Sequence, residues 1–142
     1  MKGLFTLPLL MVVLFASRAS AADGDTRQLV RLPGMMQQHM LANMRDHLAA
    51  LNAILEQLDK GQFDEAADIA ESRLGMSSLE THGASHMAGF MPEGMRNAGE
   101  AMHRAASRFA LKAQEGDALA AYRALTGITS ACVACHSSYR IR

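Results

Sequence analysis

The stretch PGMMQQHMLANMRDHLAALNAILEQLDKG, residues 33–61, decides the fold class of this 142-residue chain. Pro33 suits the first turn of a helix, and Lys60-Gly61 suits a helix end. Between them, apolar residues and one histidine recur at spacings of three and four: Met36, Met40, Met44, His47, Leu48, Leu51, Leu55 and Leu58. This spacing predicts an amphipathic helix over residues 34–59.

The residues that follow predict a second helix and a long connection. Asp64 opens a shorter helix that Gly75 ends. The sequence Ser77-Ser78-Leu79-Glu80 resembles a capping box, so we expect a further turn there. Residues 82–94 contain three glycines and Pro92, which is typical of a connecting segment.

Two more helices are predicted before the C-terminus. Pro92-Glu93 starts the third, and Asp117 caps the fourth after the turn Glu115-Gly116. The apolar positions that we expect to face inward on the third helix are Met95, Ala98, Met102, Ala105, Ala106, Phe109 and Leu111. The fourth helix carries Leu119, Tyr122, Leu125, Ile128 and Thr129 and runs almost to the end of the chain. With no strand pattern and no internal repeat, we expect an all-α, up-down-up-down four-helix bundle.

Composition agrees with packed helices and excludes one class of partner. Apolar residues make up 49% of the chain but aromatic residues only 5%, so alanine, leucine and methionine must fill the core. The 14 basic and 14 acidic residues balance. Without a basic excess or an aromatic stacking platform, nucleic acid is not expected as a partner.

The N-terminus has the pattern of an export signal. Lys2 precedes an apolar run over residues 4–15, and Ala19-Ser20-Ala21 fits a signal-peptidase site. The run is too short for the roughly 20 residues that cross a bilayer. We therefore predict a cleaved signal peptide over residues 1–21, a single domain over residues 22–142 and a periplasmic location, not an integral membrane protein. The mature chain would carry a net charge of −2.

The sequence Cys132-Val133-Ala134-Cys135-His136 is a C-x-x-C-H motif, the attachment signature of c-type haem. Two thiols one helical turn apart can add to the two vinyl groups of a porphyrin, and the next residue then offers an imidazole to iron. A disulfide would close a very small loop and distort a helix. A thioredoxin-like dithiol needs a strand before the motif, and a zinc site needs more local ligands. We expect one covalent haem c with His136 as the proximal ligand.

The last fifty residues resemble a cytochrome c prime, or class II cytochrome c. The resemblance rests on the Gly116-Asp117 turn, an Ala/Leu-rich helix, and the haem motif at the extreme end of the chain, followed by Tyr139 and Arg140. It implies a haem held between helices near one end of a four-helix bundle, with His136 partly exposed, and often a homodimer. It also implies a cation at Arg140 near the imidazole, where it would raise the reduction potential; a solvated arginine is the alternative.

The distal ligand is expected on the first predicted helix. His136 lies 20 residues after Gly116, Met44 lies 17 residues before Gly61 and Met40 lies 21 before it. In an up-down-up-down bundle these separations place both methionines near the level of the haem. The family register implied by the resemblance lands beside Met44, so Met44 is our first choice and Met40 our second. The absence of a protein ligand is the remaining alternative.

Methionine and histidine are abundant outside the haem motif. Most of these methionines are expected to fill the core. His47 and His103 are expected to be satisfied histidines at the core or its boundary, and His39 ranks below the methionines as an axial ligand. The group His82, His86, Met87 and Met91 is the best copper candidate, because imidazole and thioether both suit that metal.

These observations favour an electron carrier over two alternatives. A haem with His136 on one side and a methionine on the other would exchange electrons with periplasmic redox partner proteins. The alternatives are a five-coordinate protein that binds NO or CO, and a Met/His copper-binding protein. No acid–base pair accompanies the haem motif, so we do not predict an enzyme.

Overall fold

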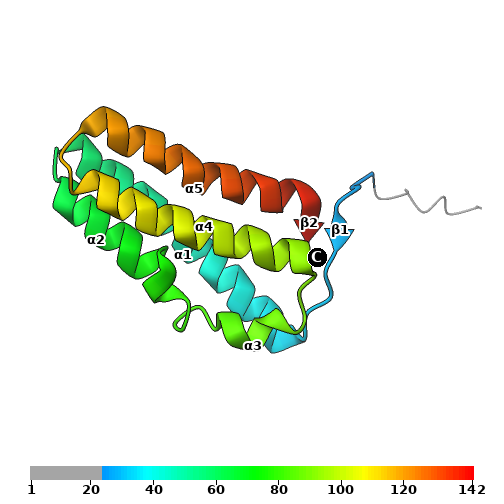
Figure 1. The fold of residues 1–142 in the computed structure, drawn as a ribbon. Coiled ribbons are helices and arrows are strands. Elements are labelled where there is room, and N and C mark those ends of the chain that lie inside the picture. Colours follow the sequence, from blue (N-terminus) through cyan, green and yellow to red (C-terminus); the bar gives the residue numbers. More distant parts are fainter. Residues whose placement is uncertain (1–23) are drawn as a thin grey trace, which may run out of the picture.

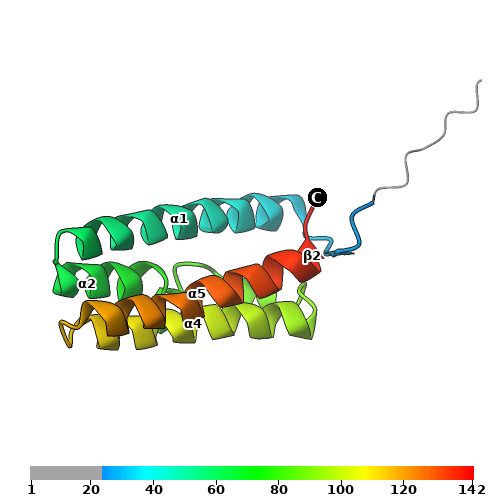
Figure 2. The same ribbon diagram turned by 90° about the horizontal axis from the view of Figure 1, so that it is seen from above.

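The computed structural model describes residues 24–142, so the predicted signal peptide, residues 1–21, lies outside the described residues. The described chain is mostly helical, which confirms the all-α prediction. In chain order the elements are β1 (Gln28–Leu29), α1 (Gly34–Asp59), α2 (Phe63–Arg73), the 3-10 turn η1 (Met76–Ser78), α3 (Ala84–Ala88), α4 (Glu93–Ala113), α5 (Ala118–Ser138) and β2 (Tyr139–Arg140). The four longest helices run alongside one another (Figure 1). α1 forms one side of the molecule, and α4 and α5 form the other (Figure 2).

The helix ends follow the chemistry of their residues. Gly61 and Gly116 have φ of 69° and 73°, a conformation that costs glycine little, and they turn the chain after α1 and α4. The Asp117 carboxylate accepts hydrogen bonds from the backbone N–H groups of Leu119 at 2.9 Å and Ala120 at 3.1 Å. Asp117 therefore caps α5, as the sequence predicts.

A core made largely of alanine fills the end of the molecule where these turns lie. Phe109 is completely buried at its centre, with Ile54, Leu74 and Ile128 around it. Small side chains let the helices approach closely, so one fully buried aromatic ring is enough to fill the centre of the core. The prediction that Leu111 faces inward is wrong: its side chain is 66% exposed, whereas Ala110 and Ala113 are buried. Leu111 is two residues after Phe109, which places it on nearly the opposite side of the helix, whereas Ala113 is four residues after Phe109 and shares its face.

The buried face of α1 also differs from the simple apolar pattern. Leu48 and Leu55 are exposed, while Ala50, Ile54 and Leu58 pack into the core. Leucines spaced along the sequence predicted the helix correctly but not which side it buries. The buried side carries Ala50, whose small side chain allows close packing, and the element that packs closely against α1 is α2.

The prediction that the chain has no β-structure is wrong for one short pair. β1 and β2 are parallel, with Gln28 opposite Tyr139 and Leu29 opposite Arg140. The Val30 N–H donates to the Arg140 carbonyl at 2.7 Å and extends the pairing. Two-residue strands have no detectable alternation, and only the helical frame brings the two chain ends together. The pair fixes the segment before α1 to the residues just after the haem motif.

The predicted capping box does not form at its expected place. η1 has no side-chain cap, and the Ser77 hydroxyl donates to the Glu71 carboxylate at 2.6 Å instead. The connection over residues 82–94 contains the single-turn helix α3, which begins after Gly83 at φ 62°. This connection is hydrogen-bonded to α1 through the His82 carbonyl, and it carries His82 and Met87 into the interior.

α5 is the one helix in the described chain that is long and apolar enough to cross a membrane, with a mean hydropathy of 1.3. This is weak evidence, because core helices of soluble proteins meet the same criterion. Only 17% of its most apolar window is buried inside the protein. Part of the remainder faces the cavity described next.

Candidate haem site

A cavity of about 620 Å³ is lined by residues of α1 on one side and of α4 and α5 on the other. Its volume is within the roughly 300–1,000 Å³ of small-molecule and cofactor sites. α3, Arg27 before α1 and residues 139–142 after α5 complete the walls. Apolar atoms dominate the lining, and the sequence-predicted ligands Met40, Met44, Cys132, Cys135 and His136 all contribute to it.

Both cysteines face this cavity from α5. Their positions three residues apart place them one turn from each other on the same helix face. Both are free thiols and half buried: Cys132 packs against the alanine-rich core, and Cys135 packs against a methionine cluster at the other end. Burial raises the pKa of both thiols, and that of Cys135 is raised further by the neighbouring Cys132. Protonated thiols near the C-terminal end of a helix do not suit a thioredoxin-like dithiol, which relies on a thiolate stabilised at a helix N-terminus.

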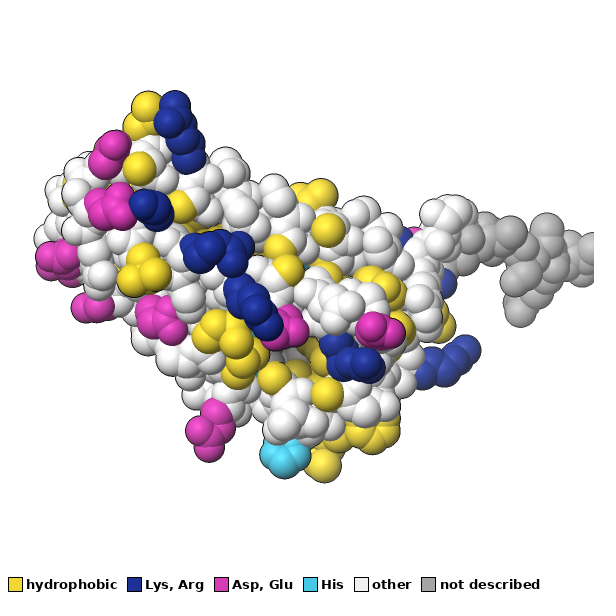
Figure 3. All heavy atoms as spheres, in the orientation of Figure 1, with side chains coloured by type: hydrophobic (Ala, Val, Ile, Leu, Met, Phe, Trp, Pro, Cys, Tyr) yellow, Lys and Arg dark blue, Asp and Glu magenta, His cyan; other side chains and the backbone are white. Residues whose placement is uncertain are grey.

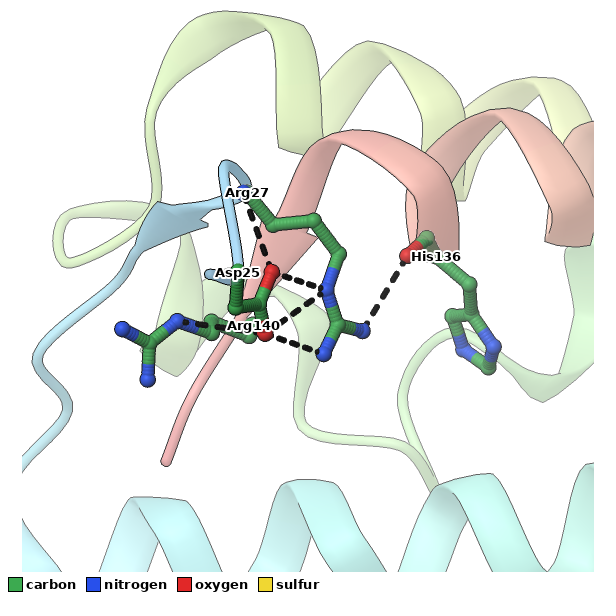
Figure 4. Close-up of polar contacts among 4 residues, drawn as sticks. All are labelled: Asp25, Arg27, His136 and Arg140. Atoms are coloured by element: carbon green, nitrogen blue, oxygen red, sulfur yellow. Dashed lines mark hydrogen bonds and ion pairs between the residues drawn. The ribbon is translucent and has the colours of Figure 1, made fainter. Parts of the chain in front are cut away.

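His136 follows directly on the same helix and lines the cavity while its side chain stays exposed. Its backbone carbonyl accepts a hydrogen bond from Arg27 Nη1 at 3.3 Å. The imidazole points away from that arginine (Figure 4). The helix end that carries His136 is thus held through its backbone, and the ring is left available.

Arg27 is a site residue that the sequence did not indicate. The Asp25 carboxylate accepts hydrogen bonds from Arg27 Nε at 2.9 Å and Nη2 at 2.6 Å, and Arg140 Nε lies 3.5 Å from the same carboxylate (Figure 4). The Arg27 hydrogen bonds hold the pKa of Asp25 well below its ordinary value. Arg27 contacts the His136 backbone. No sequence pattern links residues so far apart, and the β1–β2 pair is what joins them.

Met40 and Met44 lie one turn apart on α1 and both line the cavity. Met40 is buried in a cluster with Val30, Met87 and Met95, and Met44 packs against that cluster while remaining partly exposed. The structure therefore brings both predicted distal ligands into the cavity that holds the haem motif. Because both methionines line the same cavity, their positions alone do not decide between them as distal ligand.

Three histidines meet on the wall of the same cavity. His47 comes from α1, His82 from the connection before α3 and His103 from α4. Their ring centroids are 4.7 Å apart for His47 and His82, 5.4 Å for His82 and His103, and 5.9 Å for His47 and His103. We call this group the histidine cluster. Spacing along the chain could not predict it, because three separate segments supply it.

Hydrogen bonds hold two members of the histidine cluster in place. His103 Nδ1–H donates to the Leu74 carbonyl at 2.7 Å. Ser78 Oγ lies 3.3 Å from His82 Nδ1 and 3.4 Å from His103 Nδ1. The His82 backbone carbonyl accepts from Asn43 Nδ2 and from His39 Nε2, each at 2.9 Å.

Burial favours the uncharged form of all three rings. It lowers the pKa of His47 to about 4, with further contributions from His82 and His103. Burial likewise lowers the pKa of His82 and of His103. The prediction that His47 and His103 are core or boundary histidines agrees with this burial, although they are not isolated from each other.

The predicted copper group does not assemble as proposed. His82 and Met87 are buried and Met91 is partly buried, and all three line the cavity, but His86 is exposed on α3 and is not part of the lining. Four-residue spacing predicted a shared face only if the segment were one helix, and His82 precedes the start of α3. In the described chain, no three His, Cys, Asp or Glu side chains are arranged to hold a metal ion.

Arginines outnumber acids around the cavity. Arg27, Arg96, Arg140 and Arg142 line it together with a single carboxylate, Glu100. On the face shown in Figure 3, basic and acidic side chains are interspersed. Asp25 offsets part of this charge by pairing with Arg27 and Arg140, and the excess of positive charge that remains suits a ligand that carries carboxylates.

No family model, curated protein or solved structure matches the chain. The resemblance to class II cytochromes c therefore stays a prediction from the motif and its position.

Proposed function

We propose that this protein is a periplasmic c-type cytochrome that carries one covalent haem and transfers electrons between redox partner proteins. One observation carries the proposal: both cysteines and the histidine of the C-x-x-C-H motif share a single cavity with Met40 and Met44. Bound there, haem would supply an iron centre that cycles between two oxidation states. The proposal includes the up-down-up-down bundle, for which the four long helices and the tight turns at Gly61 and Gly116 give support.

The residues around the cavity match three features of haem: its two thioether bonds, its proximal ligand and its propionate groups. Cys132 and Cys135 present adjacent thiols for two thioether bonds. His136 presents a free imidazole as proximal ligand, and the arginine-rich lining suits two propionate groups. The cavity is mostly apolar, so it would exclude water from most of the porphyrin.

The methionines in the cavity favour an electron carrier over a gas-binding protein. A thioether from Met44, or from Met40 as second choice, would complete the coordination of the iron and raise its reduction potential. A saturated iron has no site for NO or CO. Met40 is fixed by packing, whereas Met44 is partly exposed and freer to move. We keep Met44 as the first choice for that reason.

The first experiment tests attachment. Haem should remain on the polypeptide through acid–acetone extraction and denaturing electrophoresis. The double variant Cys132→Ala, Cys135→Ala should lose it. A matched control is Ser137→Ala, an exposed change on the same helix end. Haem that is extracted freely from the wild-type protein would refute the proposal.

The second experiment tests the distal ligand. Met44→Leu should remove the thioether-to-iron charge-transfer band near the red end of the ferric spectrum, and Met40→Leu should leave it. If the charge-transfer band is lost in Met40→Leu and kept in Met44→Leu, Met40 is the distal ligand instead. A wild-type protein that lacks the band and binds carbon monoxide readily would instead indicate the five-coordinate, gas-binding function.

A further inference from the structure

Basic and acidic side chains alternate along the sides of the molecule, but its two ends differ in charge. Five arginine side chains and two carboxylates lie at the end where β1 pairs with β2 and where α1 and α4 begin (Figure 1): Arg27, Arg31, Arg96, Arg140 and Arg142, with Asp25 and Glu93. We call this end the arginine end. The opposite end, within eight residues of Gly61 or Gly116, carries seven carboxylates and four basic side chains: Glu56, Asp59, Asp64, Glu65, Asp68, Glu115 and Asp117, with Lys60, Arg108, Lys112 and Arg123.

Three separate segments supply the arginines of the arginine end. The β1–β2 pair, extended by the hydrogen bond from the residue before Arg31, places Arg27 and Arg31 beside Arg140. Arg96, from the first turn of α4, and Arg142 line the same cavity as Arg140. The fold therefore gathers into one region a charge that is dispersed along the chain.

Most of this positive charge is exposed and is not neutralised by neighbouring carboxylates. Four of the five side chains are exposed: Arg27, Arg31, Arg96 and Arg142. Asp25 is shared between Arg27 and Arg140, so one carboxylate serves two guanidinium groups. Arg96 Nη1 donates to the Met91 carbonyl at 2.7 Å. Because that partner is uncharged, Arg96 is held in place and keeps its charge.

A bound haem would not remove the difference between the two ends. Its two propionates would pair with arginines that line the cavity. Five arginines would then face four carboxylates, counting the two of the side chains, so the arginine end would stay the positive one. Arg31 lies outside the cavity lining and is exposed.

Exposed apolar side chains lie at the arginine end as well. Met35 in the first turn of α1 is 88% exposed, Phe90 just before α4 is 46% exposed, and Val133 between the two cysteines is 66% exposed. Protein interfaces combine apolar contacts with a polar rim and are enriched in arginine, methionine and aromatic residues. His136 is also exposed here. The end that carries the C-x-x-C-H motif thus has the composition of an interface.

We propose that the arginine end docks a redox partner protein whose own cofactor is surrounded by acidic side chains. The inference rests on the proposed function, because docking there brings the partner beside the C-x-x-C-H motif. Opposite charges steer the partner to the arginine end, and the carboxylates of the other end repel it.

The first arm of the test measures binding without electron transfer. The mature protein is titrated in a calorimeter with oxidised flavodoxin, an acidic flavoprotein that serves as the probe. The Debye length falls from about 30 Å to about 8 Å between about 0.01 M and 0.15 M salt, so the affinity should fall at least about tenfold. At low salt Arg31→Glu should weaken binding at least about threefold, and Arg31→Lys should bind like wild type. Arg123→Glu, the same exposed charge reversal at the opposite end, is the matched control and should stay within about twofold of wild type.

The second arm measures the rate constant of electron transfer from reduced flavodoxin to the haem-loaded protein by stopped flow. This rate constant should depend on salt and on Arg31→Glu in the same direction as the affinity. Transfer that is independent of both would overturn the docking surface while supporting the haem function. Binding without transfer would support the docking surface and count against the electron carrier.

Two other outcomes overturn the proposal. One is an equal effect of Arg31→Glu and Arg123→Glu on flavodoxin binding, which would reflect net charge and not a surface at one end. The other is sedimentation with vesicles rich in phosphatidylglycerol together with no flavodoxin binding, which would assign the arginine end to an anionic membrane instead of a protein.

Discussion

Acidification should destabilise this protein through the histidine cluster, and His47 gives the magnitude. Burial lowers its pKa from 6.5 to about 4 in the folded state. The unfolded chain therefore takes up a proton at higher pH than the folded chain does, and stability is lost as the pH falls from about 6.5 toward 4. Between pH 7.5 and pH 5.0 the loss from His47 alone is about 2 kcal/mol, since each pKa unit is worth about 1.4 kcal/mol.

The other titratable groups near His47 affect stability either in the same pH range or at lower pH. His82 and His103 have pKa values lowered by burial, so they add to the loss. Asp46 beside His47 opposes the shift of its pKa, and His136 across the cavity favours it. The carboxylates of Asp25 and Asp46 have lowered pKa values and titrate below pH 5, where they do not interfere.

The measurement is urea unfolding of the mature protein at pH 7.5 and pH 5.0. The wild type should lose at least about 2 kcal/mol of unfolding free energy between the two pH values. His47→Gln should lose about 2 kcal/mol less over the same interval, and the exposed control His86→Gln should behave like wild type. A wild-type change below about 0.5 kcal/mol, or a His47→Gln variant with the full pH dependence, would refute the assignment of a buried neutral His47.

Three further predictions follow from packing and hydrogen bonds. Phe109→Ala should cost about 3–5 kcal/mol of unfolding free energy, because it empties the centre of the core. Leu111→Ala, on the exposed face of the same helix, should change the unfolding free energy by less than about 0.5 kcal/mol. Equal effects of the two substitutions in urea unfolding would contradict the assigned helix face. Asp117→Ala should cost about 1 kcal/mol by removing two hydrogen bonds at the start of α5, and Asp117→Asn should restore most of it; a variant as stable as wild type would show that the cap contributes nothing. Arg27→Ala should make the segment before α1 more susceptible to limited proteolysis, while helix content stays unchanged. Arg31→Ala, an exposed change just beyond β1, is the control. If Arg27→Ala is cleaved no faster than wild type, the β1–β2 pairing alone holds the segment.

Local chemistry in the sequence determined the helices and most of their ends. The span 34–59 of α1, the glycine turns at Gly61 and Gly116 and the Asp117 cap depend on residues within one or two turns of each other. The C-x-x-C-H motif is equally local, because the haem attachment proposed for it needs two thiols and an imidazole on adjacent turns of one helix. Such features can be predicted from one chain without knowing what packs against it.

The tertiary structure decided which helix faces are buried and which distant residues meet. Leu111 and Leu48 are exposed because alanines, not leucines, allow these helices to approach closely. The contact of Arg27 with His136 depends on two strands that are each too short to show a pattern. His47, His82 and His103 come together from three segments, and none of the three spacings along the chain encodes that meeting. Contacts of this kind depend on the packing angles of whole helices, which the residues at the contact do not themselves set.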